Sequence, residues 1–166
     1  VVSLHLDSLA VIYKELGIEK YVHALGHNDP GLSGNGWDGV RCRKEIEKSH
    51  FKHIAKMAKA LEGIPEGNGN MLDNTLIVYL SCSGGAHHDG QKDWPFVLVG
   101  GMAKKLKMGQ YLEFSGYKEK GHRTIANLYL SFMQASGMNP PETFGQLDGS
   151  LRHPELAGPL EELMAS

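Results

Sequence analysis

The predicted fold class depends on one apolar stretch, Asn74-Thr75-Leu76-Ile77-Val78-Tyr79-Leu80. Its apolar residues are continuous and rich in β-branched side chains, which is typical of a central parallel strand buried on both faces. A second apolar strand is predicted beside it at Pro95-Phe96-Val97-Leu98-Val99. Weaker strands are predicted over 110–114 and over 20–25. Together these segments indicate a sheet that needs cover on both faces.

Helices are predicted at 3–16, 44–62 and 123–136, where apolar residues recur every three or four positions. The 44–62 helix is expected to bury Phe51, Ile54, Ala55, Ala58 and Leu61. The 123–136 helix is expected to bury Ile125, Leu128, Tyr129 and Phe132. Because strands alternate with helices, we expect a layered α/β fold. Residues 1–166 would form a single α/β domain or the C-terminal portion of a larger one, with a loop-rich tail over 139–166.

The composition bounds the class of protein. The chain has 166 residues, 41% hydrophobic and 22% charged, which is ordinary for a globular domain. Its formal net charge of -2 offers no basic field for nucleic acid or anionic lipid, so neither is expected as a partner. No apolar run is long enough to span a bilayer. The chain starts at Val1 without a signal peptide, so we expect a fragment or a processed chain.

Candidate ligand-binding residues follow two of the predicted strands. His27 and Asp29 come after the 20–25 strand, and His87, His88 and Asp89 come after the 74–80 strand. Ligands of open α/β sheets collect beyond the carboxyl ends of the strands, and imidazoles and carboxylates can bind a metal ion or transfer protons. The alternative is chance, since nine histidines are scattered along the chain.

Other reactive residues give weaker signals. Cys42 and Cys82 could form one disulfide bond or remain two free thiols. His50 and His53 are three residues apart on a predicted helix, a spacing that could suit a metal ion but is more typical of a solvated or partly packed pair. The sequence contains no GxSxG, GxxxxGK[ST] or HExxH motif. No catalytic nucleophile is therefore identified.

A succession of short segments covers most of the chain. They are Pro65 to Gly69, Met71 to Tyr79, Ser81 to Gly85, His87-His88-Asp89, Trp94 to Gly101, Gly109-Gln110-Tyr111, Asn127 to Ser131 and Phe144-Gly145. In this order they resemble the bacterial domain-of-unknown-function 1552 family, in its C-terminal part. That family in turn resembles the alkaline phosphatase and sulfatase superfamily. The resemblance implies a layered αβα sandwich with a mostly parallel sheet, incomplete here, and an exported protein, periplasmic or extracellular.

The resemblance also bears on metal binding. Metal-dependent members of the superfamily end the strand equivalent to 74–80 with an Asp-His pair that binds metal. Cys82 and Ser83 stand at the matching positions here, so a two-metal centre is not expected. One divalent ion held by His27, His87 and His88 remains open.

Two functions follow as hypotheses. The first is a non-catalytic structural or binding component, whose partners would be other protein subunits or an N-terminal half outside this chain. The second is a metal-dependent hydrolase of phosphate or sulfate esters whose nucleophile lies outside this chain. A redox role for Cys42 and Cys82 is weaker, because the sequence has no CxxC motif.

Overall fold

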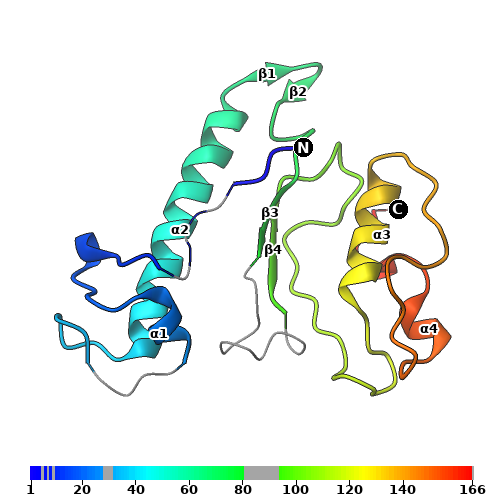
Figure 1. Ribbon diagram of the computed structural model, residues 1–166. Helices are drawn as coiled ribbons and strands as arrows, with labels where there is room; N and C mark the ends of the chain where they lie inside the picture. Colours follow the sequence, from blue (N-terminus) through cyan, green and yellow to red (C-terminus); the bar gives the residue numbers. More distant parts are fainter. Residues whose placement is uncertain (5, 7, 9, 28–31, 81–93, 166) are drawn as a thin grey trace. The chain divides into compact units, whose positions relative to one another are not determined.

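The computed structural model describes residues 1–4, 6, 8, 10–27, 32–80 and 94–165 (Figure 1). Its elements are η1 Lys14–Leu16, α1 Val22–Gly26, α2 Gly39–Glu62, β1 Pro65–Glu66, β2 Gly69–Asn70, β3 Ile77–Leu80, β4 Phe96–Val99, α3 Ile125–Ala135, α4 His153–Leu156 and η2 Glu161–Leu163. The chain divides into two compact units, one comprising Val1–Lys59 and Leu80–Pro95, the other Ala60–Tyr79 and Phe96–Ser166. The ends of α2 and β3 cross the boundaries between these units. Within the described residues, no helix is both long and apolar enough to cross a membrane.

The prediction of a layered αβα sandwich with a mostly parallel sheet is wrong. The described residues form two small antiparallel sheets of two strands each, β1 with β2 and β3 with β4. The 20–25 segment is helical in α1, and 110–114 contains no strand. β3 and β4 do form where the two apolar strands were predicted and are neighbours. Apolar character located these strands, but it does not fix their direction or their number of neighbours, which depend on the chain connections.

The first unit is built on the long helix α2. It begins at Gly39, five residues before the predicted start at 44, because the Asp38 side chain accepts a hydrogen bond of 2.7 Å from the Arg41 amide. Its buried residues are Gly39, Cys42, Ile46, His50 and Ile54. This stripe shares only Ile54 with the predicted face. Phe51, predicted to be buried, is 38% exposed. The predicted helix end at Glu62 is confirmed, and Gly63 follows it.

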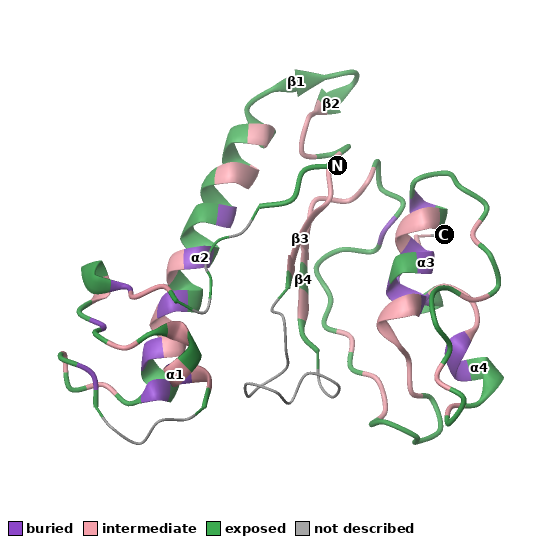
Figure 2. Cartoon of the chain, in the orientation of Figure 1, coloured by how far each residue is buried: buried purple, intermediate pink, exposed green. Residues whose placement is uncertain are grey.

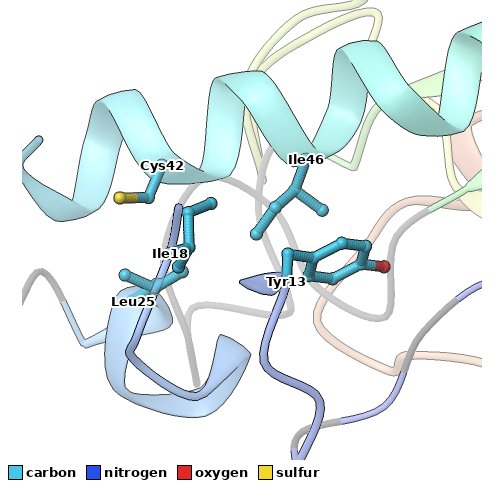
Figure 3. Packing of buried hydrophobic residues seen from close by; sticks show 5 residues of the cluster. All are labelled: Tyr13, Ile18, Leu25, Cys42 and Ile46. Carbon is cyan, nitrogen blue, oxygen red and sulfur yellow. The ribbon is translucent and has the colours of Figure 1, made fainter. Parts of the chain in front are cut away.

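The segment before α2 supplies the other half of this core. Tyr13, Ile18 and Leu25 pack with Cys42 and Ile46 of α2, as Figure 3 shows. The helix predicted over 3–16 is wrong in the described part, where only the short 3₁₀ helix η1 forms. The predicted stop at 17 holds, because Gly17 adopts a left-handed conformation with φ of 71°. Packing onto α2 overrides the weak helical periodicity of this segment.

The second unit has its own core around α3. The buried members are Leu106, Leu128, Ala135, Leu160 and Leu163, and partly buried residues of the β3–β4 region pack against them. The predicted helix and its Gly137 cap are confirmed, with φ of 83° at Gly137. The predicted apolar face is partly wrong, since Tyr129 is 38% exposed and contacts Phe132 and Phe144. Figure 2 shows the buried stripe of α3 in purple.

The β3–β4 sheet is covered less than its sequence predicts. No residue of either strand is buried, and Val97 is 36% exposed. In Figure 2 both strands are pink and green, without a buried position. The prediction of a strand buried on both faces is therefore wrong for the described chain. In a two-stranded sheet each strand is an edge strand, so it is not enclosed as a central strand of a parallel sheet is.

Candidate functional site

Of the five residues predicted to bind a ligand, the structure describes only His27. Asp29, His87, His88, Asp89 and Cys82 lie outside the described residues, so their part in a joint site stays a prediction. The strand predicted over 20–25, which would have placed His27 at a sheet edge, does not form, because Val22–Gly26 is helical in α1.

The structure instead brings His27 to His23. The two residues are four positions apart at α1, and their Nε2 atoms lie 3.0 Å from one another. The ring centroids are 4.8 Å apart and the ring planes are inclined by 47°. Both side chains are exposed to solvent.

The sequence predicts no role for His23, because it predicts a strand over 20–25. In a strand, residues four positions apart are separated by about 13 Å. On a helix, residues at i and i+4 are neighbours at about 5–6 Å. The spacing His23-Ala24-Leu25-Gly26-His27 was the available signal, and it required the helical interpretation.

The short helix that presents the two histidines is held at several points. Leu25 is fully buried against Ile18, Cys42 and the rest of the first core. The Val22 amide donates to the Val11 carbonyl at 3.0 Å. The Arg43 guanidinium donates to the Leu25 carbonyl from α2. Backbone and core contacts therefore fix the position of α1, although it has only five residues.

The two histidines of α2 lie in different environments. His50 is buried at 6% exposure, and its Nε2 lies 2.7 Å from the Tyr13 hydroxyl. His53 is exposed. Because His50 is turned into the core, the metal hypothesis for the His50 and His53 pair receives no geometric support.

Cys42 occupies the same core. It is fully buried, and its Sγ lies 3.5 Å from the Ser33 hydroxyl and 3.9 Å from the Trp37 carbonyl. The other cysteine, Cys82, lies outside the described part of the chain, so the alternatives of one disulfide bond and two free thiols both stay open.

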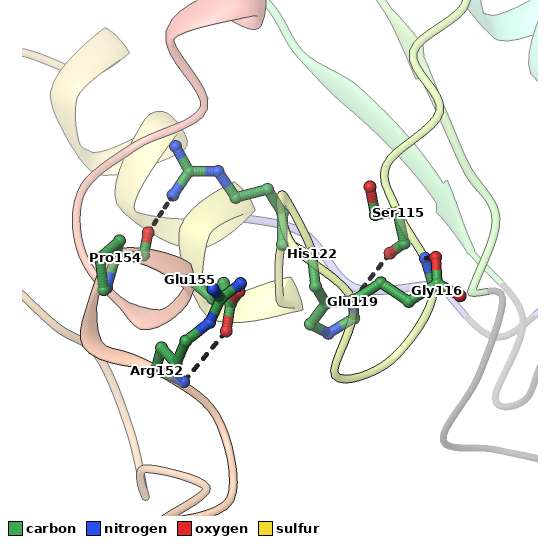
Figure 4. Close-up of polar contacts among 8 residues, drawn as sticks. Ser115, Gly116, Glu119, His122, Arg152, Pro154 and Glu155 are labelled. Carbon is green, nitrogen blue, oxygen red and sulfur yellow. Dashed lines mark hydrogen bonds and ion pairs between the residues drawn. The ribbon is translucent and has the colours of Figure 1, made fainter.

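In the second unit, polar groups near α4 join distant parts of the chain (Figure 4). The His122 Nδ1–H donates to the Ser115 carbonyl at 2.9 Å. Arg152 forms an ion pair with Glu155, whose side chain is buried. The Arg152 hydrogen bond, followed by weaker effects that include His122, lowers the pKa of the Glu155 carboxyl. These charges are engaged in holding the fold.

An exposed cluster in this unit surrounds Asp148. The Tyr117 hydroxyl donates to Oδ2 at 2.5 Å, and the Ser150 hydroxyl donates to Oδ1 at 2.6 Å. The Ser150 hydroxyl and then the Tyr117 hydroxyl lower the pKa of Asp148 to about 2. Hydrogen bonds to the charged carboxylate favour that form. The cluster closes a turn onto the segment that carries Tyr117.

Among the described residues, no group of three or more His, Cys, Asp or Glu side chains is arranged to hold a metal ion. Comparisons with models of protein families, with curated protein sequences and with solved structures found no match for this chain. The resemblance to the domain-of-unknown-function 1552 family therefore stays a prediction.

Proposed function

We propose that this chain is a non-catalytic binding or structural component of a larger protein assembly. The observation that carries the proposal is the incomplete burial of the β3–β4 sheet. Ile77 and Val78 are half-buried and Val97 is 36% exposed, although every residue of both strands is apolar. Burying apolar surface contributes about 25 cal/mol per Å², so cover on these strands would stabilise the protein.

The partner that fits this surface is another polypeptide. A two-stranded sheet is marginal in water by itself and gains stability from more strands or from packing. In the described chain β3 and β4 pair with one another and with no further strand. An extended segment of another protein subunit could add to such a sheet and supply apolar side chains as well. The net charge of -2 favours a protein partner over nucleic acid.

Export to the periplasm or the extracellular space is part of the same proposal. Its support is the sequence resemblance described above. Fractionation of the source cells with an antibody against the chain tests it, and recovery in the cytoplasmic fraction alone would contradict it.

The partner is tested by site-specific photo-crosslinking in the source cells. A photoreactive residue at Val97 should give one discrete crosslinked polypeptide, identified by mass spectrometry. The matched control is Val40, which is 60% exposed on α2 in the first unit and should give no such product. Val97→Lys should abolish co-purification of the identified partner, whereas Val40→Lys should leave it unchanged. Equal crosslinking at both positions would contradict the proposal.

The proposal that the chain has no catalytic activity is tested separately. The purified chain is loaded with Zn²⁺, Mn²⁺ or Mg²⁺ and assayed on phosphate and sulfate esters. We expect no turnover above that of the heat-denatured sample. Hydrolysis that follows the metal content would favour the competing hypothesis, a metal-dependent hydrolase.

A further inference from the structure

We infer that His23 and His27 form a two-imidazole site for a divalent transition-metal ion, with a geometry that suits Cu²⁺ or Ni²⁺ better than Zn²⁺. The inference goes beyond the proposed assembly role and does not depend on it. Histidine pairs at i and i+4 on one helix face place two imidazole nitrogens where one metal ion can bind both. Here the two Nε2 atoms are 3.0 Å apart.

The distance between the nitrogens fixes the angle at the ion. With metal–nitrogen bonds of about 2.0–2.1 Å, nitrogens 3.0 Å apart subtend an angle of roughly 95°. The ring centroids provide a second check, because rings that both point Nε2 at such an ion have centroids roughly 4.7 Å apart. The centroids in the structure are 4.8 Å apart. The pair therefore needs little rearrangement to become a chelate.

An angle near 90° selects among metals. It is the angle between adjacent ligands in square-planar and tetragonal sites, which are typical of Cu²⁺ and Ni²⁺. A tetrahedral Zn²⁺ ion would need the nitrogens about 3.3 Å apart. The general order of affinity for divalent ions also places Cu²⁺ above Ni²⁺ and Zn²⁺. The angle therefore favours Cu²⁺ and Ni²⁺ over Zn²⁺, and the affinity order places Cu²⁺ first.

Both imidazoles are exposed to solvent, so an ion can reach them. His23 also lines a surface depression together with Ala10, Tyr21 and Ala24. The backbone between the two histidines is anchored in the core, because Leu25 is fully buried. A binding site on a packed element keeps its geometry better than one on a loop.

The protons of the pair also balance. Without metal, one Nε2–H donates to the other Nε2 across the 3.0 Å contact. Binding needs both Nε2 lone pairs, so the proton of the donating ring moves to its own Nδ1 through solvent. This change of tautomer leaves the number of protons on the ring unchanged.

The test is isothermal titration calorimetry of the full chain with CuCl₂, NiCl₂ and ZnCl₂ at one fixed neutral pH. We expect one Cu²⁺ ion per chain, and about tenfold or greater loss of affinity in both His23→Ala and His27→Ala, because either change removes the chelate. The matched control His53→Ala removes an exposed histidine of α2 and should bind as the unchanged chain does. Circular dichroism should show that all three variants remain folded.

A second measurement locates the ion directly. Substoichiometric Cu²⁺ should broaden the ring NMR signals of His23 and His27 before those of other histidines. Cu²⁺ affinity that survives both alanine substitutions, or that is lost in a His87→Ala and His88→Ala double variant while His23→Ala has no effect, would overturn the inference. Tighter binding of Zn²⁺ than of Cu²⁺ would overturn the assigned geometry.

Discussion

Asn127 is the residue on which the second unit is expected to depend most. It is fully buried in the first turn of α3. Its Oδ1 accepts hydrogen bonds from the amide and the hydroxyl of Thr124, at 2.8 and 2.9 Å. Its Nδ2 donates to the carbonyls of Ala157 and Gly158, at 3.1 and 2.8 Å. One side chain therefore caps the helix and anchors the C-terminal segment to it.

The magnitude follows from these contacts. Loss of the helix cap costs about 1 kcal/mol. Each of the two hydrogen bonds of Nδ2 contributes about 1 kcal/mol. Asn127→Ala should therefore lower the free energy of unfolding of the second unit by about 3 kcal/mol. That is a large share of the 5–15 kcal/mol typical of a whole domain.

Urea denaturation followed by amide hydrogen exchange of α3 measures this loss. Exchange reports the second unit even if the two units do not unfold together. Asn127→Asp keeps the acceptor oxygen of the cap but loses both donated bonds, so it should also be strongly destabilised. Gln134→Ala, at an exposed position of the same helix, should change stability by less than about 0.5 kcal/mol. An Asn127→Asp variant as stable as the unchanged chain would refute the anchoring role.

Two further predictions concern the same unit. Gly100→Ala should lower the free energy of unfolding, measured by urea denaturation, by at least about 2 kcal/mol. Gly100 has φ of 89°, and an added Cβ would lie 2.2 Å from a backbone carbonyl oxygen. The control Gly149→Ala should leave this free energy nearly unchanged, because the space around Gly149 is open. Because the pKa of Asp148 is lowered to about 2 by the hydroxyls of Ser150 and Tyr117, its hydrogen bonds should stabilise the fold above about pH 4 and lose this effect as the pH falls toward 2. In a ¹³C NMR titration Tyr117→Phe should raise the carboxyl midpoint, and an unchanged midpoint would contradict this assignment.

Of the pair His23 and His27, the sequence predicts only His27 as a site residue. His27 was selected for its place after a predicted strand, and the structure finds it beside another imidazole for a different reason. The 20–25 segment has apolar residues that suit either a short strand or a helical turn, and a run of this length does not distinguish them. The burial of Leu25 against α2 favours the helix, and the helix places His23 next to His27.

Local sequence determined the elements whose signals are strong and self-contained. The helix predicted over 123–136 and the strands predicted over 74–80 and 95–99 form as the shorter elements α3, β3 and β4. The left-handed stops at Gly17 and Gly137 form as predicted. These features depend on backbone conformation and on periodicity over a few turns, which neighbouring residues set. Tertiary structure alone decided the two separate cores, the antiparallel sheets and the stripe of α2 that is buried. Those depend on which distant segments meet, and apolar surface attracts any apolar surface without specifying the direction or identity of its partner.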